Sequence, residues 1–170
     1  LICVAATGYD NIDLEYCREN NIEVCNVPAS SVYSVAQVTA SMVLSLANHL
    51  KEYNKSVSDG TYSNGKSANI LTPVYHELYK KKWGIIGYGA IGKRVGEIAK
   101  ALGCEIMAFK RTPEDGVYCT DIDTIIENCD IISIHIPLSP ETKGLISRER
   151  IEKMKDKVII VNTARGLVTD

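Results

Sequence analysis

Residues 82–109, KWGIIGYGAIGKRVGEIAKALGCEIMAF, decide the fold of this chain. A short apolar run from Trp83 to Ile86 indicates a buried strand, and the glycine-rich turn GYGAIG follows it. The next stretch carries apolar residues at the three- and four-residue spacing of a helix, namely Ile91, Val95, Ile98, Ala99 and Leu102. Gly103 ends that helix, and a second apolar run over 106–109 predicts another strand. Strand, glycine turn, helix and strand follow in the order of the dinucleotide-binding fingerprint.

Each glycine of the turn has a steric reason to be there. Gly87 permits the tight turn, Gly89 lets the backbone approach a pyrophosphate without a Cβ, and Gly92 lets the helix pack closely on the sheet. The N–H groups at the start of the helix, near Ala90 and Ile91, would face the phosphates. A purely structural turn is the alternative, but the flanking strand and helix favour a nucleotide site.

Composition narrows the class of protein. The 170 residues are 45% hydrophobic, which suffices for a normal core, and the net charge of −2 favours neither nucleic acid nor an anionic membrane as partner. The six cysteines form no C-x-x-C pair, so we expect neither a metal site nor a disulfide framework. We therefore expect the protein to work in a reduced, cytoplasmic setting. No apolar run reaches 18 residues, and no signal peptide is recognised. Because the chain opens without Met and stops just after a strand and a glycine, we expect a fragment.

The rest of the chain also alternates strands with helices, which predicts an α/β fold with a doubly wound, Rossmann-type parallel sheet covered on both faces. Before the fingerprint we expect a buried strand over 1–6, a helix over 14–20, a strand over 22–27, a surface loop over 60–72 and a helical turn within 73–78. After it we expect strands over 117–120, 131–136 and 157–161, with helices over 121–128 and 148–154. A long helix opening at Ser31 carries an apolar stripe that we interpret as core or interface packing: Val35, Val38, Met42, Leu46 and Leu50.

Five motifs occur in order along the chain: VAATGYDNID, NVPASSVYSVAQ, GIIGYGAIG, DIISIHIPLSPETKGLI and VIIVNTARGLVTD. Together they resemble the D-isomer-specific 2-hydroxyacid dehydrogenase family, and the first two are most similar to its glycerate dehydrogenase (hydroxypyruvate reductase) branch. The resemblance implies that residues 1–28 are the end of the first segment of a flavodoxin-like substrate domain. Residues 29–170 would then be the NAD(P)-binding Rossmann domain, truncated at its C-terminal end. It also implies a homodimer in the full-length protein, with the helix from Ser31 supplying part of the interface.

The chemistry implied by the resemblance is hydride transfer between a nicotinamide and a small 2-oxo or D-2-hydroxy acid, such as hydroxypyruvate/D-glycerate or glyoxylate. Arg165, in NTARG, matches the catalytic arginine that binds the substrate; a strand cap or a surface ion pair is the alternative. Thr7 and Gly8 match the loop whose N–H groups bind the substrate carboxylate. The alternative is that they form an ordinary turn between a strand and a helix. The family's general-acid histidine and its glutamate would lie beyond Asp170, so we expect the isolated chain to be inactive or nearly so.

Further cofactor contacts are implied at the strand ends: His135, Ile136, Pro137, Thr142, Asn162, Thr163, Ala164 and Arg165. His135 does not match the general acid; we expect it to line the cleft through its backbone or to pack there. Backbone contacts are expected for Thr163 and Ala164, and core packing is the better explanation for Ile136.

The choice of cofactor depends on the end of the second strand. An acidic residue about 20 positions past the fingerprint normally binds the ribose 2′-OH. Lys110 stands 18 residues after Gly92 (110 − 92), followed by Arg111 and Thr112. Because no carboxylate is there to repel a 2′-phosphate, the sequence favours NADP over NAD. The alternative is that both cations point into solvent.

Two other functions remain open. One is a cofactor-sensing binding protein of the same fold, similar to a corepressor, which a family histidine and glutamate after Asp170 would argue against. The other is a different Rossmann protein such as a methyltransferase, in which NTARG and SVAQ would have no role.

Overall fold

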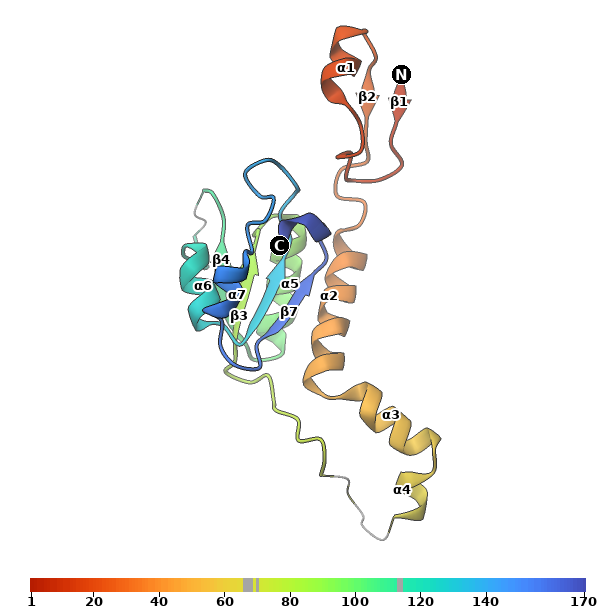
Figure 1. Ribbon diagram of the computed structural model, residues 1–170, viewed down its shortest axis with the longest axis vertical. Coiled ribbons are helices and arrows are strands. Elements are labelled where there is room, and N and C mark those ends of the chain that lie inside the picture. Colours follow the sequence, from red (N-terminus) through yellow and green to blue (C-terminus); the bar gives the residue numbers. More distant parts are fainter. Residues whose placement is uncertain (66–68, 70, 113–114) are drawn as a thin grey trace.

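The computed structural model describes residues 1–65, 69, 71–112 and 115–170, and its centre is a five-stranded parallel sheet (Figure 1). The strands run in the order β5-β4-β3-β6-β7. Their bounds are Lys82–Ile86 for β3, Glu105–Phe109 for β4, Tyr118–Cys119 for β5, Ile131–Ile134 for β6 and Ile159–Asn162 for β7. In register, Trp83 pairs with Ile106 on one side and with Ile131 on the other. The predicted Rossmann-type sheet is therefore confirmed.

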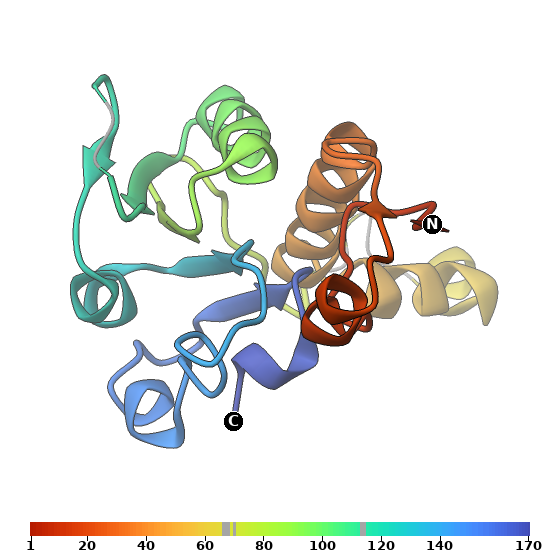
Figure 2. The same cartoon turned by 90° about the horizontal axis from the view of Figure 1, so that it is seen from above.

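Helices cover both faces of this sheet (Figure 2). On one face lie α5 (Ala90–Ala101) and α2 (Val32–Ala47), and on the other lie α6 (Ile122–Asn128) and α7 (Arg148–Glu152). Alternate residues of β3 serve the two faces, because side chains alternate along a strand. Trp83 and Ile85 are fully buried with Val95 of α5, whereas a Cβ on Gly84 would press against Ile125 of α6. Burial on both faces explains why these strands read as continuous apolar runs.

The first three elements of the chain, within residues 2–25, form a small N-terminal unit that stands apart from the sheet (Figure 1). Strand β1 (Ile2–Cys3) pairs in parallel with β2 (Val24–Cys25), and α1 (Leu14–Glu19) connects them. Asp13 caps α1 by accepting a hydrogen bond from the N–H of Tyr16 at 2.9 Å. The expectation of a buried strand over 1–6 was wrong: only two residues of that range form the strand and Leu1 is 79% exposed, because no further layer of the described residues covers the pair.

The crossover helix α2 begins after Ser31, as predicted, but it packs through a different face than expected. Its buried residues are small, namely Ala36, Thr39, Ala40 and Val43, and they allow close packing against α5 and β7. Most of the predicted apolar stripe points outward, with Val38, Met42 and Leu46 about half exposed. Core packing within this chain was therefore the wrong interpretation for those three residues, and the interface alternative remains.

After α2 the chain turns at His49, which has a left-handed φ of 49°, into α3 (Leu50–Ser58) and α4 (Thr61–Asn64). The loop predicted over 60–72 therefore contains a short helix, and the rest of that prediction falls partly on residues 66–68 and 70, outside the described residues. The helical turn predicted within 73–78 is not formed. A 3₁₀ turn, η1 (Gly166–Val168), follows β7. Among the residues described, no helix is long and apolar enough to cross a membrane.

Candidate cofactor and substrate cleft

Because the five strands are parallel, the segments that follow β3, β6 and β7 meet at one edge of the sheet. A cleft of about 540 Å³ lies at this edge, between the strand ends and the N-terminal unit. It is lined by three of the predicted segments and by the first turn of α5: residues 6–10, Ile91, 135–138 and 163–165. The topology thus brings together motifs that lie more than 150 residues apart in the chain.

The glycine turn has the geometry that its sequence requires. Gly87 has φ +100°, and a Cβ there would press on the backbone of His135. A Cβ on Gly92 would overlap the carbonyl oxygen of Gly87, so this glycine lets α5 start directly against the turn. Gly89, the N-cap of α5, has nothing within 4 Å of where its Cβ would be. This open backbone, next to the unpaired N–H groups of a helix start, fits a diphosphate.

Arg165 lies at the mouth of the cleft and forms an ion pair with Asp10 of the N-terminal unit. Its Nε donates to the two carboxylate oxygens at 2.9 and 3.1 Å, and its Nη2 donates to Oδ1 at 2.7 Å. The hydrogen bonds from Arg165 lower the pKa of Asp10, and Asp10 in turn raises the pKa of Arg165. The two side chains stay 42% and 39% exposed, so the guanidinium remains accessible to a ligand.

Gly8 lies directly beneath this guanidinium. A Cβ at Gly8 would collide with Nη2 of Arg165, so any larger residue there would displace the guanidinium from this position. Thr7 has a structural role through its side chain: its hydroxyl donates to the carbonyl of Val27 at 3.1 Å, while Asn26 donates to the Thr7 carbonyl at 2.9 Å. The predicted substrate loop and the predicted catalytic arginine therefore lie together. Asp10 was missed as a candidate, although it lies within the quoted ATGYDNID motif.

His135 contributes its side chain to the cleft, as well as its backbone. Its Nδ1 lies 3.2 Å from the hydroxyl of Thr163, which lies 3.1 Å from the hydroxyl of Thr39 on α2. Burial lowers the pKa of His135 to about 4, so the ring is neutral near pH 7. Its Nε2 is buried and has no hydrogen-bond partner in the described part of the chain. Sequence reasoning expected only backbone contacts for Thr163, and it gave no signal for Thr39.

Three other predicted residues shape the loops around the cleft. Thr142 closes the turn after β6: its hydroxyl donates to the carbonyl of Pro137 at 2.7 Å and accepts from the N–H of Ser139 at 2.8 Å. Asn162 accepts from the N–H of Ala164 at 3.0 Å and donates to the carbonyl of Arg165 at 2.9 Å, which fixes the loop that carries the arginine. Ile136 is buried in the core cluster on the α6 side, as expected from its apolar side chain.

The basic residues predicted to select the cofactor follow β4. The N–H groups of Gly87 and Tyr88 both donate to the carbonyl of Phe109, at 3.0 and 3.1 Å, so Lys110 follows immediately beside the glycine turn. Arg111 and Thr112 are exposed. The 540 Å³ cleft does not reach these three residues, whose neighbours 113 and 114 lie outside the description.

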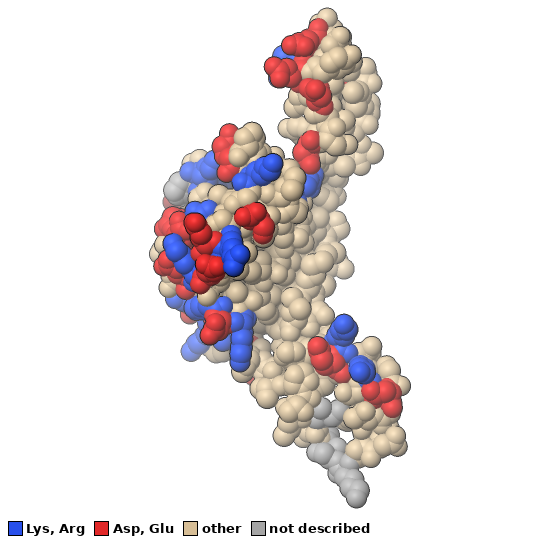
Figure 3. Space-filling model, viewed as in Figure 1, with Lys and Arg blue, Asp and Glu red and all other residues tan. Residues whose placement is uncertain are grey.

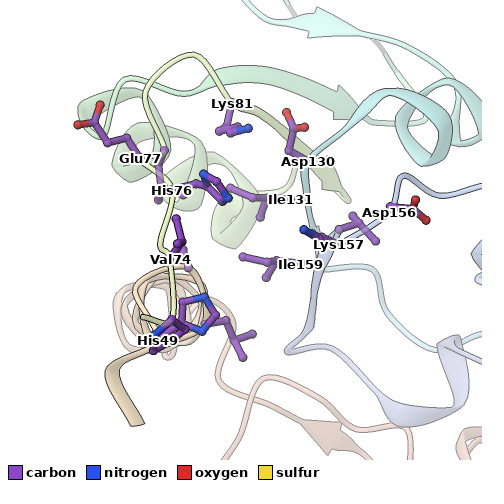
Figure 4. A pocket seen from close by; sticks show the side chains of 15 residues that line it. His49, Val74, His76, Glu77, Lys81, Asp130, Ile131, Asp156, Lys157 and Ile159 are labelled. Atoms are coloured by element: carbon purple, nitrogen blue, oxygen red, sulfur yellow. The ribbon is translucent and has the colours of Figure 1, made fainter. Parts of the chain in front are cut away.

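A second cavity, of about 640 Å³, lies at the opposite edge of the sheet, where β6 and β7 begin (Figure 4). It is lined by the end of α2, the segment around His76, and residues such as Asp130 and Lys157. None of the predicted site residues lines this cavity, because those residues follow the strands and the cavity lies where the strands begin. Within the described ranges, no group of three or more His, Cys, Asp or Glu residues is arranged to hold a metal ion.

Comparison with known proteins identifies the family to which this chain belongs. Residues 40–170 match the model of the D-isomer specific 2-hydroxyacid dehydrogenase, NAD binding domain. The hydroxypyruvate reductase of Blautia hydrogenotrophica is 36% identical over 168 residues, which are 96% of this chain and 52% of that protein.

Two solved structures of similar proteins support the same family assignment. The D-lactate dehydrogenase of Aquifex aeolicus, complexed with NAD and lactic acid, matches with a TM-score of 0.87 and 34% identity over 100% of this chain and 52% of that one. An acyclic imino acid reductase in complex with NADPH and D-Arg matches with a TM-score of 0.90 and 27% identity over 99% and 54%. The chain spans about half the length of these proteins. It belongs to the D-isomer-specific 2-hydroxyacid dehydrogenase family.

Proposed function

We propose that this chain is the nucleotide-binding half of an NAD(P)-dependent oxidoreductase that interconverts a small 2-oxo acid and its D-2-hydroxy acid. Hydroxypyruvate/D-glycerate is the favoured pair, supported by the similarity to a hydroxypyruvate reductase, and glyoxylate is the alternative. The observation that carries the proposal is the cleft itself, where an open glycine turn and an accessible guanidinium share one edge of the sheet. Residues 1–28 would belong to the substrate domain and residues 29–170 to the nucleotide domain.

The bound nicotinamide dinucleotide would supply or accept the hydride. Gly87, Gly89 and Gly92 would admit its diphosphate to the start of α5. Arg165 would bind the substrate carboxylate and polarise the adjacent carbonyl, since a planar guanidinium can serve two oxygens at once. Asp10 would hold the guanidinium over Gly8, and the N–H group of Gly8 would donate to the same carboxylate. The general acid and its glutamate partner would come from the rest of a longer protein.

The proposal is tested by Arg165→Lys in the full-length protein that contains this chain. We expect kcat/KM for hydroxypyruvate to fall by about 100-fold or more, because lysine provides charge without the paired donors. The Kd for the dinucleotide should change by less than about twofold. Arg148→Lys is the matched control, since Arg148 lies on α7, is not among the residues that line the cleft, and forms an exposed ion pair to Glu152. Tight dinucleotide binding without turnover of any 2-oxo acid by the unsubstituted protein would favour the cofactor-sensing alternative.

For the cofactor we propose a preference for NADPH over NADH. The support is the absence of a carboxylate at 110–112 together with the cations Lys110 and Arg111. The structural relatives include one complex with NAD and one with NADPH, so both cofactors suit the fold. The test is the ratio of the Kd for NADH to the Kd for NADPH in the unsubstituted protein, which should exceed one. Arg111→Ser should lower this ratio. Equal affinities, or tighter NADH binding, would refute it.

We also propose that the full-length protein is a homodimer that uses the outer face of α2, and that it works in the reducing cytoplasm suited to its free thiols. Helix α2 contains no charged residue, and it forms an uncharged band between the charged surfaces of the sheet unit and of α3 (Figure 3). Val38, Met42 and Leu46 project from this band. Met42→Lys should shift the sedimentation coefficient to that of a monomer, while Glu52→Lys on α3 should not. A dimer that survives Met42→Lys would place the interface elsewhere.

A further inference from the structure

A line of hydrogen-bonding groups runs from the interior of α2 to the cleft. The Thr39 hydroxyl lies 2.8 Å from the carbonyl oxygen of Val35 and 3.1 Å from the Thr163 hydroxyl. The Thr163 hydroxyl lies 3.2 Å from Nδ1 of His135. Thr39 is fully buried, so water does not compete for its hydroxyl. The line therefore ends at a buried carbonyl on one side and at the imidazole of His135 on the other.

The carbonyl end fixes the direction of every proton in this line. A carbonyl only accepts, and a hydroxyl has a single proton, so Thr39 donates to Val35 and can only accept from Thr163. Thr163 has then used its own proton and can only accept from His135. Nδ1 must therefore carry the proton of the neutral ring. The opposite direction would leave two oxygens, on Thr39 and Val35, 2.8 Å apart with no proton between them.

The other ring nitrogen is left as a bare acceptor. Nε2 of His135 is buried and finds no partner among the residues that the structure describes. A buried acceptor without a donor destabilises the free protein, and a ligand that supplies a donor removes that cost. His135 follows β6, between the glycine turn after β3 and Arg165 after β7. A dinucleotide that places its diphosphate at Gly89 and its reactive carbon near Arg165 would bring its nicotinamide nucleoside between them.

We propose that Thr39 and Thr163 hold His135 in its Nδ1–H tautomer, so that Nε2 accepts a hydrogen bond from an O–H or N–H group of the nicotinamide nucleoside. The inference rests on the proposed function, because it needs the dinucleotide in this cleft. Thr39 is then a positioning residue that acts from behind the cleft, through Thr163. The donor is either a ribose hydroxyl or the carboxamide NH₂, which are the donors on that half of the cofactor.

The first test compares Thr39→Val with Thr39→Ser in the full-length protein. Valine removes the acceptor for Thr163, which is then free to donate to Nδ1, and the ring proton moves to Nε2. We expect the dinucleotide Kd to rise about tenfold, the effect of one buried hydrogen bond lost, while Thr39→Ser retains wild-type affinity. Nitrogen-15 NMR of labelled histidine, assigned with His135→Phe, reads the tautomer directly: Nδ1–H in the wild type and in Thr39→Ser, and Nε2–H in Thr39→Val.

A second pair of variants tests the acceptor itself and does not depend on Thr39→Val folding well. His135→Gln retains an acceptor near Nε2 and should bind the dinucleotide more tightly than His135→Phe. The dinucleotide analogue with an acetyl group in place of the carboxamide distinguishes the donors. If the carboxamide is the donor, the analogue should bind wild type and His135→Phe alike, and if a ribose hydroxyl is the donor the tenfold difference should persist.

An Nε2–H tautomer in the wild type would overturn the inference, as would wild-type affinity in a Thr39→Val protein whose ring has switched. Equal affinities of His135→Gln and His135→Phe would overturn it too. A wild-type protein that binds no nicotinamide dinucleotide would refute the proposed function instead, and the NMR comparison would still report whether the threonine line sets the tautomer.

Discussion

Gly89→Ala should separate the role of the glycine turn in cofactor binding from its role in folding. Gly89 is the N-cap of α5, with φ −84° and ψ −160°, a conformation open to any residue. A Cβ there would have no atom of the described residues within 4 Å, so the folded protein accommodates it. The same Cβ would occupy the space into which we place the diphosphate.

The expected change in stability is small because two effects oppose each other. Alanine restricts the unfolded chain and stabilises the folded state by about 0.4–1 kcal/mol where its conformation is allowed. Alanine is also a poorer N-cap than glycine, which costs about 1 kcal/mol at most. The net change should stay within about 1 kcal/mol, which is at most about 4 °C in Tm for a protein of 150 residues or more. Binding should suffer more, because the loss of one charge-assisted hydrogen bond to phosphate costs about 1.5–3 kcal/mol, which is roughly a 10- to 150-fold rise in Kd.

The assay is a thermal melt without ligand beside a fluorescence titration with NADPH and NADH, on the full-length protein. Gly166→Ala is the control, because a Cβ there also meets no atom of the described residues within 4 Å and Gly166 lies outside the glycine turn. A Gly89→Ala protein with unchanged Tm and unchanged Kd would show that the dinucleotide does not approach this turn. A fall of more than 10 °C would show that the turn has a folding role that the open space at Gly89 does not reveal.

Four further outcomes follow from the packing and the titrating groups. Gly92→Ala should destabilise the protein by about 1–3 kcal/mol in a urea titration, because its Cβ would overlap the Gly87 carbonyl; unchanged stability would contradict this. Ile132→Ala should cost about 2–5 kcal/mol, since Ile132 is fully buried, and a cost under 1 kcal/mol would mean that the α6 face repacks. Hydrogen bonds from Thr124 lower the pKa of Asp121 to about 2 from an unfolded value of 3.8, so its cap stabilises α6 above about pH 4 and is lost as pH falls through 2. Thermal melts should therefore show a steeper loss of Tm from pH 4 to pH 2 in wild type than in Asp121→Asn. Burial raises the thiol pKa values of Cys104 to about 11 and of Cys129 to about 12, so neither should react with a thiol reagent at pH 8 until the protein unfolds.

The sheet could be predicted from sequence because its signals are local. Each strand of the sheet is a short apolar run, and the glycine turn joins one of them to a helix within 30 residues. Asp121 and Ser147 cap helices that begin where the residue types indicate, with Asp121 accepting from the N–H of Thr124 at 2.8 Å. Once the strands are parallel, the meeting of their carboxyl ends follows from topology alone. The positions of Gly87 and Arg165 at one edge therefore needed no information beyond the order of elements.

The apolar stripe of α2 shows where local patterns mislead. Val38, Met42 and Leu46 have helical spacing and large side chains, yet the helix packs through Ala36, Ala40 and Val43. Periodicity reports that a face is apolar but does not report which body covers it. When a helix has two apolar faces, the smaller residues suit the tighter contact, and here the larger ones remain about half exposed.

The contacts that complete the cleft lie outside any local pattern, because each joins distant parts of the chain. Asp10 and Arg165 are 155 residues apart, and Thr39 and Thr163 are 124 apart. Residue type alone gives little guidance, since a buried threonine within a helix commonly satisfies its hydroxyl on its own backbone, as Thr39 does with Val35. The hydrogen bond from Thr39 to Val35 affects His135 only because the fold places the Thr163 hydroxyl beside Thr39 and the His135 ring beside Thr163. A hydroxyl that looks locally satisfied thereby sets which nitrogen of His135 carries the proton.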